Sequence, residues 1–131
     1  MSLTQDRNTP MKDTETLVIP VAANVHIFAG SLVVASATGF AAPGSTALGL
    51  SYLGRAEEEV DNRGGAAGAR QVEIRHGKAF QWDNDGTITQ AHLFKPAYIV
   101  DDETVAAADA GGTRSAAGRI VGIDADGVWV E

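Results

Sequence analysis

Residues 54–80 read GRAEEEVDNRGGAAGARQVEIRHGKAF, and this stretch carries the strongest indication of the fold. Val72 and Ile74 alternate with Glu73 and Arg75, which is the period-two pattern of a strand with one buried face. Before this strand lie an acidic run and a loop of glycine and alanine. Because glycine-containing loops between such segments are typical of β-hairpins, the stretch predicts two strands joined by a pliable tip.

Further strands are expected on both sides of this hairpin. From residue 17 onward, short apolar runs are separated by Gly, Pro, Asn and Asp at intervals of about ten residues, as in sandwiches and small barrels. The expected strands are 17–21, 25–28, 32–36, 40–42, 48–56, 72–82, 97–100, 104–107, 118–124 and 128–131. The predicted fold class is therefore mainly β, a small antiparallel barrel or sandwich with one short helix and an extended N-terminal arm.

Three local signals refine this prediction. Pro20 lacks a backbone N–H group, so the first strand is expected at a sheet edge or to end there. His76 and Lys78 fall on the apolar face of the strand 72–82, which predicts that the chain bends or leaves the core near Gly77. The short helix is expected within 87–94, because Pro96 prevents its continuation.

The N-terminal segment, residues 1–16, differs from the rest of the chain. Its only apolar side chains are Met1, Leu3 and Met11, and Pro10 blocks a helix across its middle. Such a segment buries too little surface to offset its ordering entropy of roughly 1 to 2 kcal/mol per residue. We expect a flexible arm over 1–16, either a frayed terminus or a segment that orders on a partner, followed by a single β-rich domain over 17–131.

Composition restricts the classes of function. The 131-residue chain has no cysteine, which excludes disulfides and thiolate chemistry, and its net charge of -7 disfavours nucleic acid and anionic membranes as partners. No apolar run approaches the ~20 residues that cross a bilayer, and the N-terminus lacks a signal-peptide pattern. We therefore expect a soluble protein made in the cytoplasm.

No motif in the sequence supports catalysis or a cofactor. The histidines His26, His76 and His92 lie in three separate segments without metal-ligand spacing, and residues 83–86, DNDG, are expected to form a turn rather than a calcium loop. The acids Glu57, Glu58, Glu59 and Asp61 are expected to be solvated with ordinary pKa values or to contact a basic partner surface. The chain is accordingly predicted to be no enzyme and to bind neither cofactor nor metal.

The order of segments resembles the head decoration, or capsid cement, proteins of tailed bacteriophages and Mu-like prophages. The resemblance rests on the polar arm with DRNTP at 6–10, on AGSLV at 29–33 and on LGRAEE at 53–58. It continues with VEIRHG at 72–77, YIVDDETV at 98–105 and the ending VWVE at 128–131. It therefore covers most of the chain.

This resemblance implies a structural protein of the virion that binds the outside of the assembled capsid and stabilises it. It implies the major capsid protein as partner, a homo-oligomer, often a trimer, and synthesis in the cytoplasm of a host bacterium. Our hypothesis is that the arm makes the capsid contact, through Arg7, Asn8, Thr9, Pro10 and Met11, by adding as a strand to a sheet edge.

Two alternatives come from other classes of function. A carbohydrate-binding or adhesive module displayed on a virion would use Trp82 and Trp129 as exposed stacking platforms. A small enzyme would assemble its site from His76, His92 and nearby acids.

Overall fold

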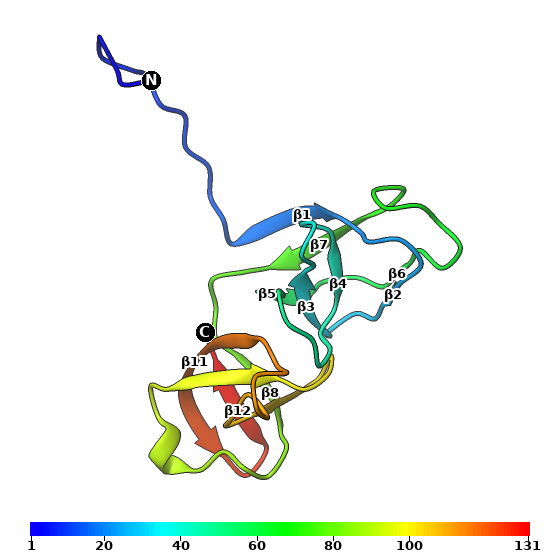
Figure 1. Cartoon of the computed structure of the whole chain (residues 1–131), viewed down its shortest axis with the longest axis vertical. Helices are drawn as coiled ribbons and strands as arrows, with labels where there is room; N and C mark the ends of the chain where they lie inside the picture. The colour runs from blue at the N-terminus through cyan, green and yellow to red at the C-terminus, as the bar shows by residue number, and fades with distance from the viewer.

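The computed structural model describes residues 1–131, and its first half forms an open antiparallel sheet. The order of strands across this sheet is β1-β7-β5-β3-β4. Its members are β1 (Thr16–Pro20), β3 (Leu32–Ala35), β4 (Ala41–Pro43), β5 (Ser51–Ala56) and β7 (Gln71–Arg75). Figure 1 shows the sheet as one half of an elongated body from which the N-terminal segment projects.

The two edges of this sheet are short strands that each end in a proline. β1 pairs with β7 through its whole length, from Thr16 opposite Arg75 to Pro20 opposite Gln71, and has no strand on its other side. β4 occupies the opposite edge and ends at Pro43. The edge position expected from Pro20 is thus confirmed.

The stretch 57–70 is not the simple hairpin tip that its composition predicts. β5 and β7 do pair antiparallel, but between them β6 (Val60–Asp61) leaves to pair with β2 (His26–Ile27). The buried Asn62 then holds the loop, since its Nδ2 donates to the carbonyls of Ala22 at 2.8 Å and Ala66 at 3.1 Å. A buried amide side chain therefore ties the start of the loop to the neighbouring segment.

The second half of the chain forms a closed barrel, which begins after the chain crosses over at residues 76–79. The crossing confirms the bend expected near Gly77. Around the barrel the order is β10-β8-β12-β11-β9, and β10 pairs with β8 in parallel, which closes the ring. The strands are β8 (Phe80–Asn84), β9 (Pro96–Ile99), β10 (Thr104–Ala106), β11 (Ala116–Asp124) and β12 (Gly127–Val130). The mainly β fold with a small barrel, predicted from the sequence, is confirmed.

The helix expected within 87–94 is a single 3-10 turn, η1 (Gln90–His92). Thr89 precedes it, and the Thr89 backbone N–H donates to His92 Nδ1 at 2.9 Å. Phe94 has a φ of 65°, a conformation that ends any helix. The expected helix is thus limited to this one turn, and the chain enters β9 at Pro96.

Apolar side chains gather in two clusters, one in the sheet and one in the barrel. The sheet cluster contains Val33, Val72 and Ile74 among its eight buried residues. The barrel cluster has eleven, and Leu32 and Val34 belong to it although β3 is a strand of the sheet. Because side chains alternate along a strand, β3 serves as a wall shared by both clusters.

A second link between the halves joins Tyr52 of β5 to Trp82 of β8. The indole Nε1 of Trp82 donates to Tyr52 Oη at 2.9 Å. Burial raises the pKa of Tyr52 to about 12, although the hydrogen bond from Trp82 partly opposes that rise. The neutral phenol is therefore the form that the folded protein favours.

This pKa leads to a prediction for alkaline solution. An unfolded tyrosine ionises near its ordinary pKa of about 10, so the unfolded state loses its proton first as the pH rises. The stability due to the protonated phenol is complete below pH 10 and falls between pH 10 and 12, by an amount on the order of 3 kcal/mol. Urea unfolding at pH 8 to 12 measures this loss.

Tyr52→Phe is the control, because other groups also titrate in this range. The difference in unfolding free energy between the two proteins should shrink as the pH rises from 10 to 12. A difference that stays constant over this range contradicts the prediction.

Candidate functional site

The predicted contact residues Arg7, Asn8, Thr9, Pro10 and Met11 all lie on the projecting arm (Figure 1). Every one of them is exposed, and the side chain of Met11 is almost wholly in solvent. Arg7 Nη1 donates to Thr9 Oγ1 at 2.6 Å, a hydrogen bond within the arm itself. The segment 1–14 contains neither strand nor helix, so its backbone groups are available to a partner.

The base of the arm is fixed to β7 and to the residues that follow it. The His76 backbone N–H donates to the Glu15 carbonyl at 2.9 Å, and Lys78 Nζ lies 2.9 Å from Glu15 Oε1. Lys78 lowers the pKa of the Glu15 carboxyl by this hydrogen bond and by its charge. Arg75 Nη1 donates to Thr16 Oγ1 at 3.4 Å. The arm therefore starts from a defined point beside a group of cations.

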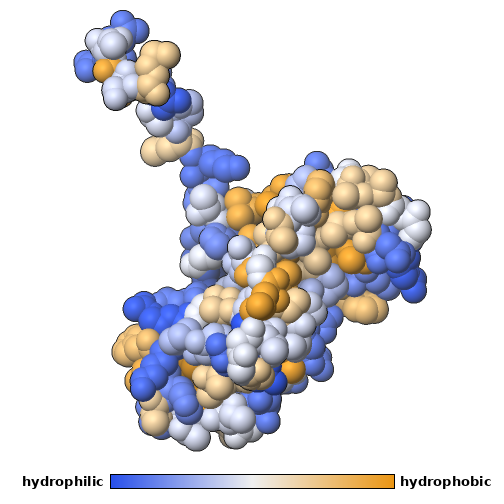
Figure 2. All heavy atoms as spheres, in the orientation of Figure 1, coloured by the Kyte–Doolittle hydropathy of each residue, from blue (hydrophilic) through white to orange (hydrophobic).

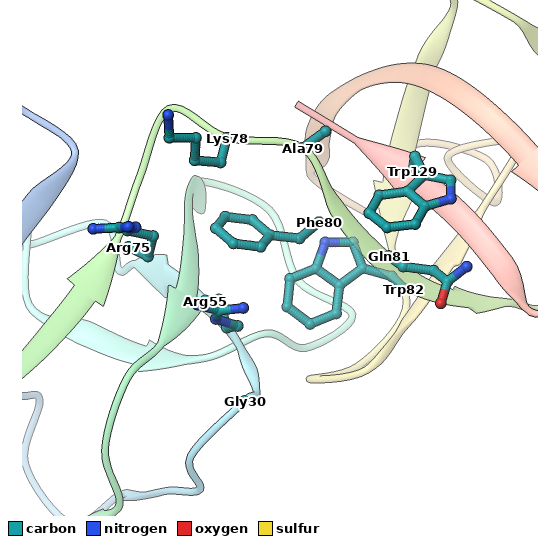
Figure 3. A pocket seen from close by; sticks show the side chains of 9 residues that line it. All are labelled: Gly30, Arg55, Arg75, Lys78, Ala79, Phe80, Gln81, Trp82 and Trp129. Atoms are coloured by element: carbon teal, nitrogen blue, oxygen red, sulfur yellow. The ribbon is translucent and has the colours of Figure 1, made fainter.

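These cations line a cleft of about 460 Å³ at the junction of sheet and barrel. Figure 3 shows that the lining side chains come from both halves, with the cations on the sheet side and the indole of Trp129 on the barrel side. The lining residues are Gly30, Arg55, Arg75, Lys78, Ala79, Phe80, Gln81, Trp82 and Trp129. The cleft thus combines positive charge with aromatic surface.

The two arginines of the cleft are neighbours across the β5–β7 pair, where Arg55 lies opposite Arg75. Arg55 places its guanidinium 4.9 Å from the centre of the Phe80 ring and 2.8 Å from a Glu57 oxygen. Arg75 forms no salt bridge. Like charges directly opposite one another in a sheet repel, so this pair favours an anion between or beside them.

The two tryptophans of the cleft differ in exposure. Trp129 is 39% exposed, and its Nε1 donates to Asp124 Oδ2 at 3.0 Å. Trp82 is only 5% exposed and belongs to the barrel cluster. The expectation that both are exposed stacking platforms is wrong for Trp82, because its alternation along β8 points it into the barrel. Of the two tryptophans, only Trp129 presents its ring to solvent.

The acidic run does not converge on one site. Glu57 pairs with Arg55, Glu59 lies 3.3 Å from His26, and Glu58 accepts a hydrogen bond from the Glu73 backbone. Asp61 binds the Arg63 guanidinium, and this hydrogen bond holds the pKa of the Asp61 carboxyl well below its usual range. The expectation of ordinary pKa values is therefore wrong for Asp61, because a cation two residues away stabilises its charge.

The histidines also remain apart. His26 lies beside Glu59, the His76 Nδ1 is 2.6 Å from the Leu53 carbonyl oxygen, and His92 caps η1. No three acidic or histidine side chains are grouped so that they could hold a metal ion. Asp83 and Asn84 are the last residues of β8, and the chain turns after them, where Asn84 Oδ1 accepts from the Gly86 backbone at 2.8 Å. No helix of the structure has the length and apolarity needed to cross a membrane.

Large apolar side chains are exposed singly on the body. Phe94 is 63% exposed, and the Arg119 guanidinium lies 5.2 Å from its ring centre. The others are Val18, Phe28, Leu48 and Trp129. On the face drawn in Figure 2, apolar surface is more extensive over the sheet than over the barrel, and polar residues interrupt it. An arginine stacked on an exposed aromatic ring is a composition typical of protein interfaces.

Sequence reasoning names the arm but misses the cleft. Arg55, Arg75 and Lys78 stand within the stretch 54–80, yet Trp129 lies at the opposite end of the chain. The one feature of the sequence that could have indicated the cleft is the presence of Arg75 and Lys78 near the predicted strand end at Gly77. Comparison of the chain with protein-family models, with curated proteins and with solved structures finds no match.

Proposed function

We propose that this chain is a capsid decoration protein, a structural protein that binds the outside of an assembled bacteriophage capsid and stabilises it. The observation that carries the proposal is the exposed arm, which projects from a β-rich body and is anchored at its base. An arm with unpaired backbone groups is suited to add a strand to a sheet edge of a partner. The order of segments along the chain supports the same role, through its resemblance to decoration proteins.

In this proposal the major capsid protein is the partner, and the protein resides on the virion surface after synthesis in a bacterial host. The activity is binding, without a chemical reaction. A homotrimer is proposed from the resemblance alone, and native mass spectrometry of the full chain tests it.

Removing the arm should weaken binding to undecorated capsid shells by about 100-fold, since a second linked contact contributes that much or more. The deletion should cover residues 1–13, because Glu15 and Thr16 support the body through His76, Lys78 and Arg75. Co-sedimentation with shells measures the binding, and circular dichroism checks that the body stays folded.

The matched control is a full-length chain with residues 1–13 in scrambled order. It keeps the length, charge and composition of the arm, so it should bind as weakly as the deletion if specific residues such as Arg7 and Met11 make the contact. Shell binding by the truncated protein equal to that of the full chain contradicts the proposal.

A second candidate function is carbohydrate binding on the virion surface. One observation favours it: the partly exposed ring of Trp129 lies in a cleft beside the polar side chain of Gln81. A sugar stacked on that ring would alter its fluorescence. Fluorescence titration with neutral oligosaccharides therefore separates this candidate from the first.

A further inference from the structure

We propose that the cleft at the sheet–barrel junction binds an acidic side chain, in an extended peptide segment, of the protein that also receives the arm. The inference rests on the proposed function for the identity of that protein, the capsid subunit. The chemistry of the cleft argues separately for the carboxylate.

Positive charge is concentrated at the cleft. The chain has 17 acidic residues and 10 lysines and arginines, yet three of those cations line a single cleft. Glu57 pairs with Arg55 and Glu15 pairs with Lys78, whereas Arg75, opposite Arg55 across the paired strands, has no salt bridge. A guanidinium presents a planar set of donors that matches a carboxylate, so Arg75 is free to bind one from outside the molecule.

A carboxylate of the chain itself binds one of the cations that line the cleft. Glu15 Oε1 lies 2.9 Å from Lys78 Nζ at the base of the arm. Lys78 is thus already paired with an acid carried on an extended backbone. An incoming acidic segment would run beside Glu15 and place its own carboxylate near Arg75.

The shape and polarity of the cleft walls also favour a carboxylate carried on a peptide. Phe80 and Trp129 provide aromatic surface, and charges beside such walls interact more strongly than in open water. Gly30 lines the cleft without a side chain, which leaves room for a peptide backbone. A volume of about 460 Å³ accommodates a side chain with part of its backbone rather than a folded surface.

Other anions and neutral ligands fit these features less well. A nucleic acid or another extended polyanion would meet the net charge of -7 outside the cleft. A neutral sugar would use the ring of Trp129 but would leave Arg75 without an acid. A single carboxylate on a peptide uses both the guanidinium of Arg75 and the aromatic walls.

A solution experiment tests the cleft without capsids. Acetylated tetraglutamate amide is titrated into the full chain while tryptophan fluorescence is recorded, with tetraglutamine amide, inorganic phosphate and a neutral oligosaccharide as comparison ligands. We expect a saturable change with tetraglutamate, weakened by added salt, and none with tetraglutamine. Equal responses to tetraglutamate and tetraglutamine, or a stronger response to phosphate or to the sugar, overturn the proposal.

Arg75→Gln should weaken tetraglutamate binding about 10-fold, as loss of a charge-assisted hydrogen bond does. Arg70→Gln is the matched control, since it removes the same charge from an exposed residue that lies outside the cleft. Near-ultraviolet circular dichroism verifies that both variants keep the native fold. Equal affinities of the two variants overturn the proposal.

Capsid shells then test the identity of the partner. We expect Arg75→Gln to bind shells about 10-fold more weakly than Arg70→Gln, even with the arm intact. Shell binding that is equal for the two variants overturns the assignment of the acid to the capsid subunit. If even the unaltered chain fails to bind shells, the proposed function fails, whereas failure of the cleft alone appears in the peptide titration.

Discussion

Replacing Gly54 with alanine is expected to reduce the free energy of unfolding by about 3 kcal/mol or more. Gly54 is buried in β5 and has a φ of 138°. Residues other than glycine rarely adopt this backbone conformation. A methyl group built there would overlap the carbonyl oxygen of Arg75 and lie 3.3 Å from the Phe80 ring. The β5–β7 pair would have to separate, and urea unfolding measures the effect.

Gly64→Ala separates the two causes of this loss of stability, which are backbone strain and steric overlap. Gly64 also has a positive φ, of 75°, but a methyl group there would meet nothing within 4 Å. Its cost should be limited to the backbone strain of roughly 1 to 2 kcal/mol. Gly54→Ala should in addition displace Arg55 relative to Arg75 and weaken tetraglutamate binding, which Gly64→Ala should leave intact. Equal losses of stability in the two variants contradict this account.

Leu32→Ala is expected to destabilise the protein by about 3 kcal/mol and to loosen both halves together. Leu32 is fully buried and packs in the barrel cluster, while its neighbour Val33 packs in the sheet cluster. The Leu32 backbone N–H also donates to the carbonyl of Asp102, in the turn between β9 and β10, at 2.7 Å. A cavity on one side of β3 should therefore shift the strand for both clusters.

Amide hydrogen exchange reports the two halves separately. Protection should fall at Ile74 in the sheet and at Val128 in the barrel by similar factors. Leu48→Ala makes the same chemical change at a side chain that is 64% exposed, and should alter stability by less than about 0.5 kcal/mol. Wild-type protection at Ile74 in Leu32→Ala, with loss only at Val128, would show that β3 does not couple the clusters.

The strands could be predicted because their signals are local. Pro20 forbids a central position whatever the rest of the chain does, and the polar residues His76 and Lys78 cannot continue an apolar face. The turn after β8 is likewise formed by short-range hydrogen bonds of Asn84 and Asp85. Such features depend on neighbouring residues and survive whichever topology the chain adopts.

The parts that could not be predicted depend on contacts between distant residues. The barrel closes through a parallel pairing of β10 with β8. Neither the turn residues nor the alternation of apolar residues in the sequence indicates this pairing. The cleft needs the register of β5 against β7 and the return of β12 to β8, which brings Trp129 opposite Gln81. Asn62 looks like an ordinary loop residue until its amide is found bonded to carbonyls on either side.

The prolines at the two edges of the sheet have a consequence for behaviour at high concentration. An exposed strand edge is a template on which another molecule can add, and this is a common route to aggregation. Here Pro20 removes a donor from β1, β4 is three residues long and ends in Pro43, and the barrel has no free edge. Copies of the body crowded side by side therefore have little opportunity to join their sheets into fibres.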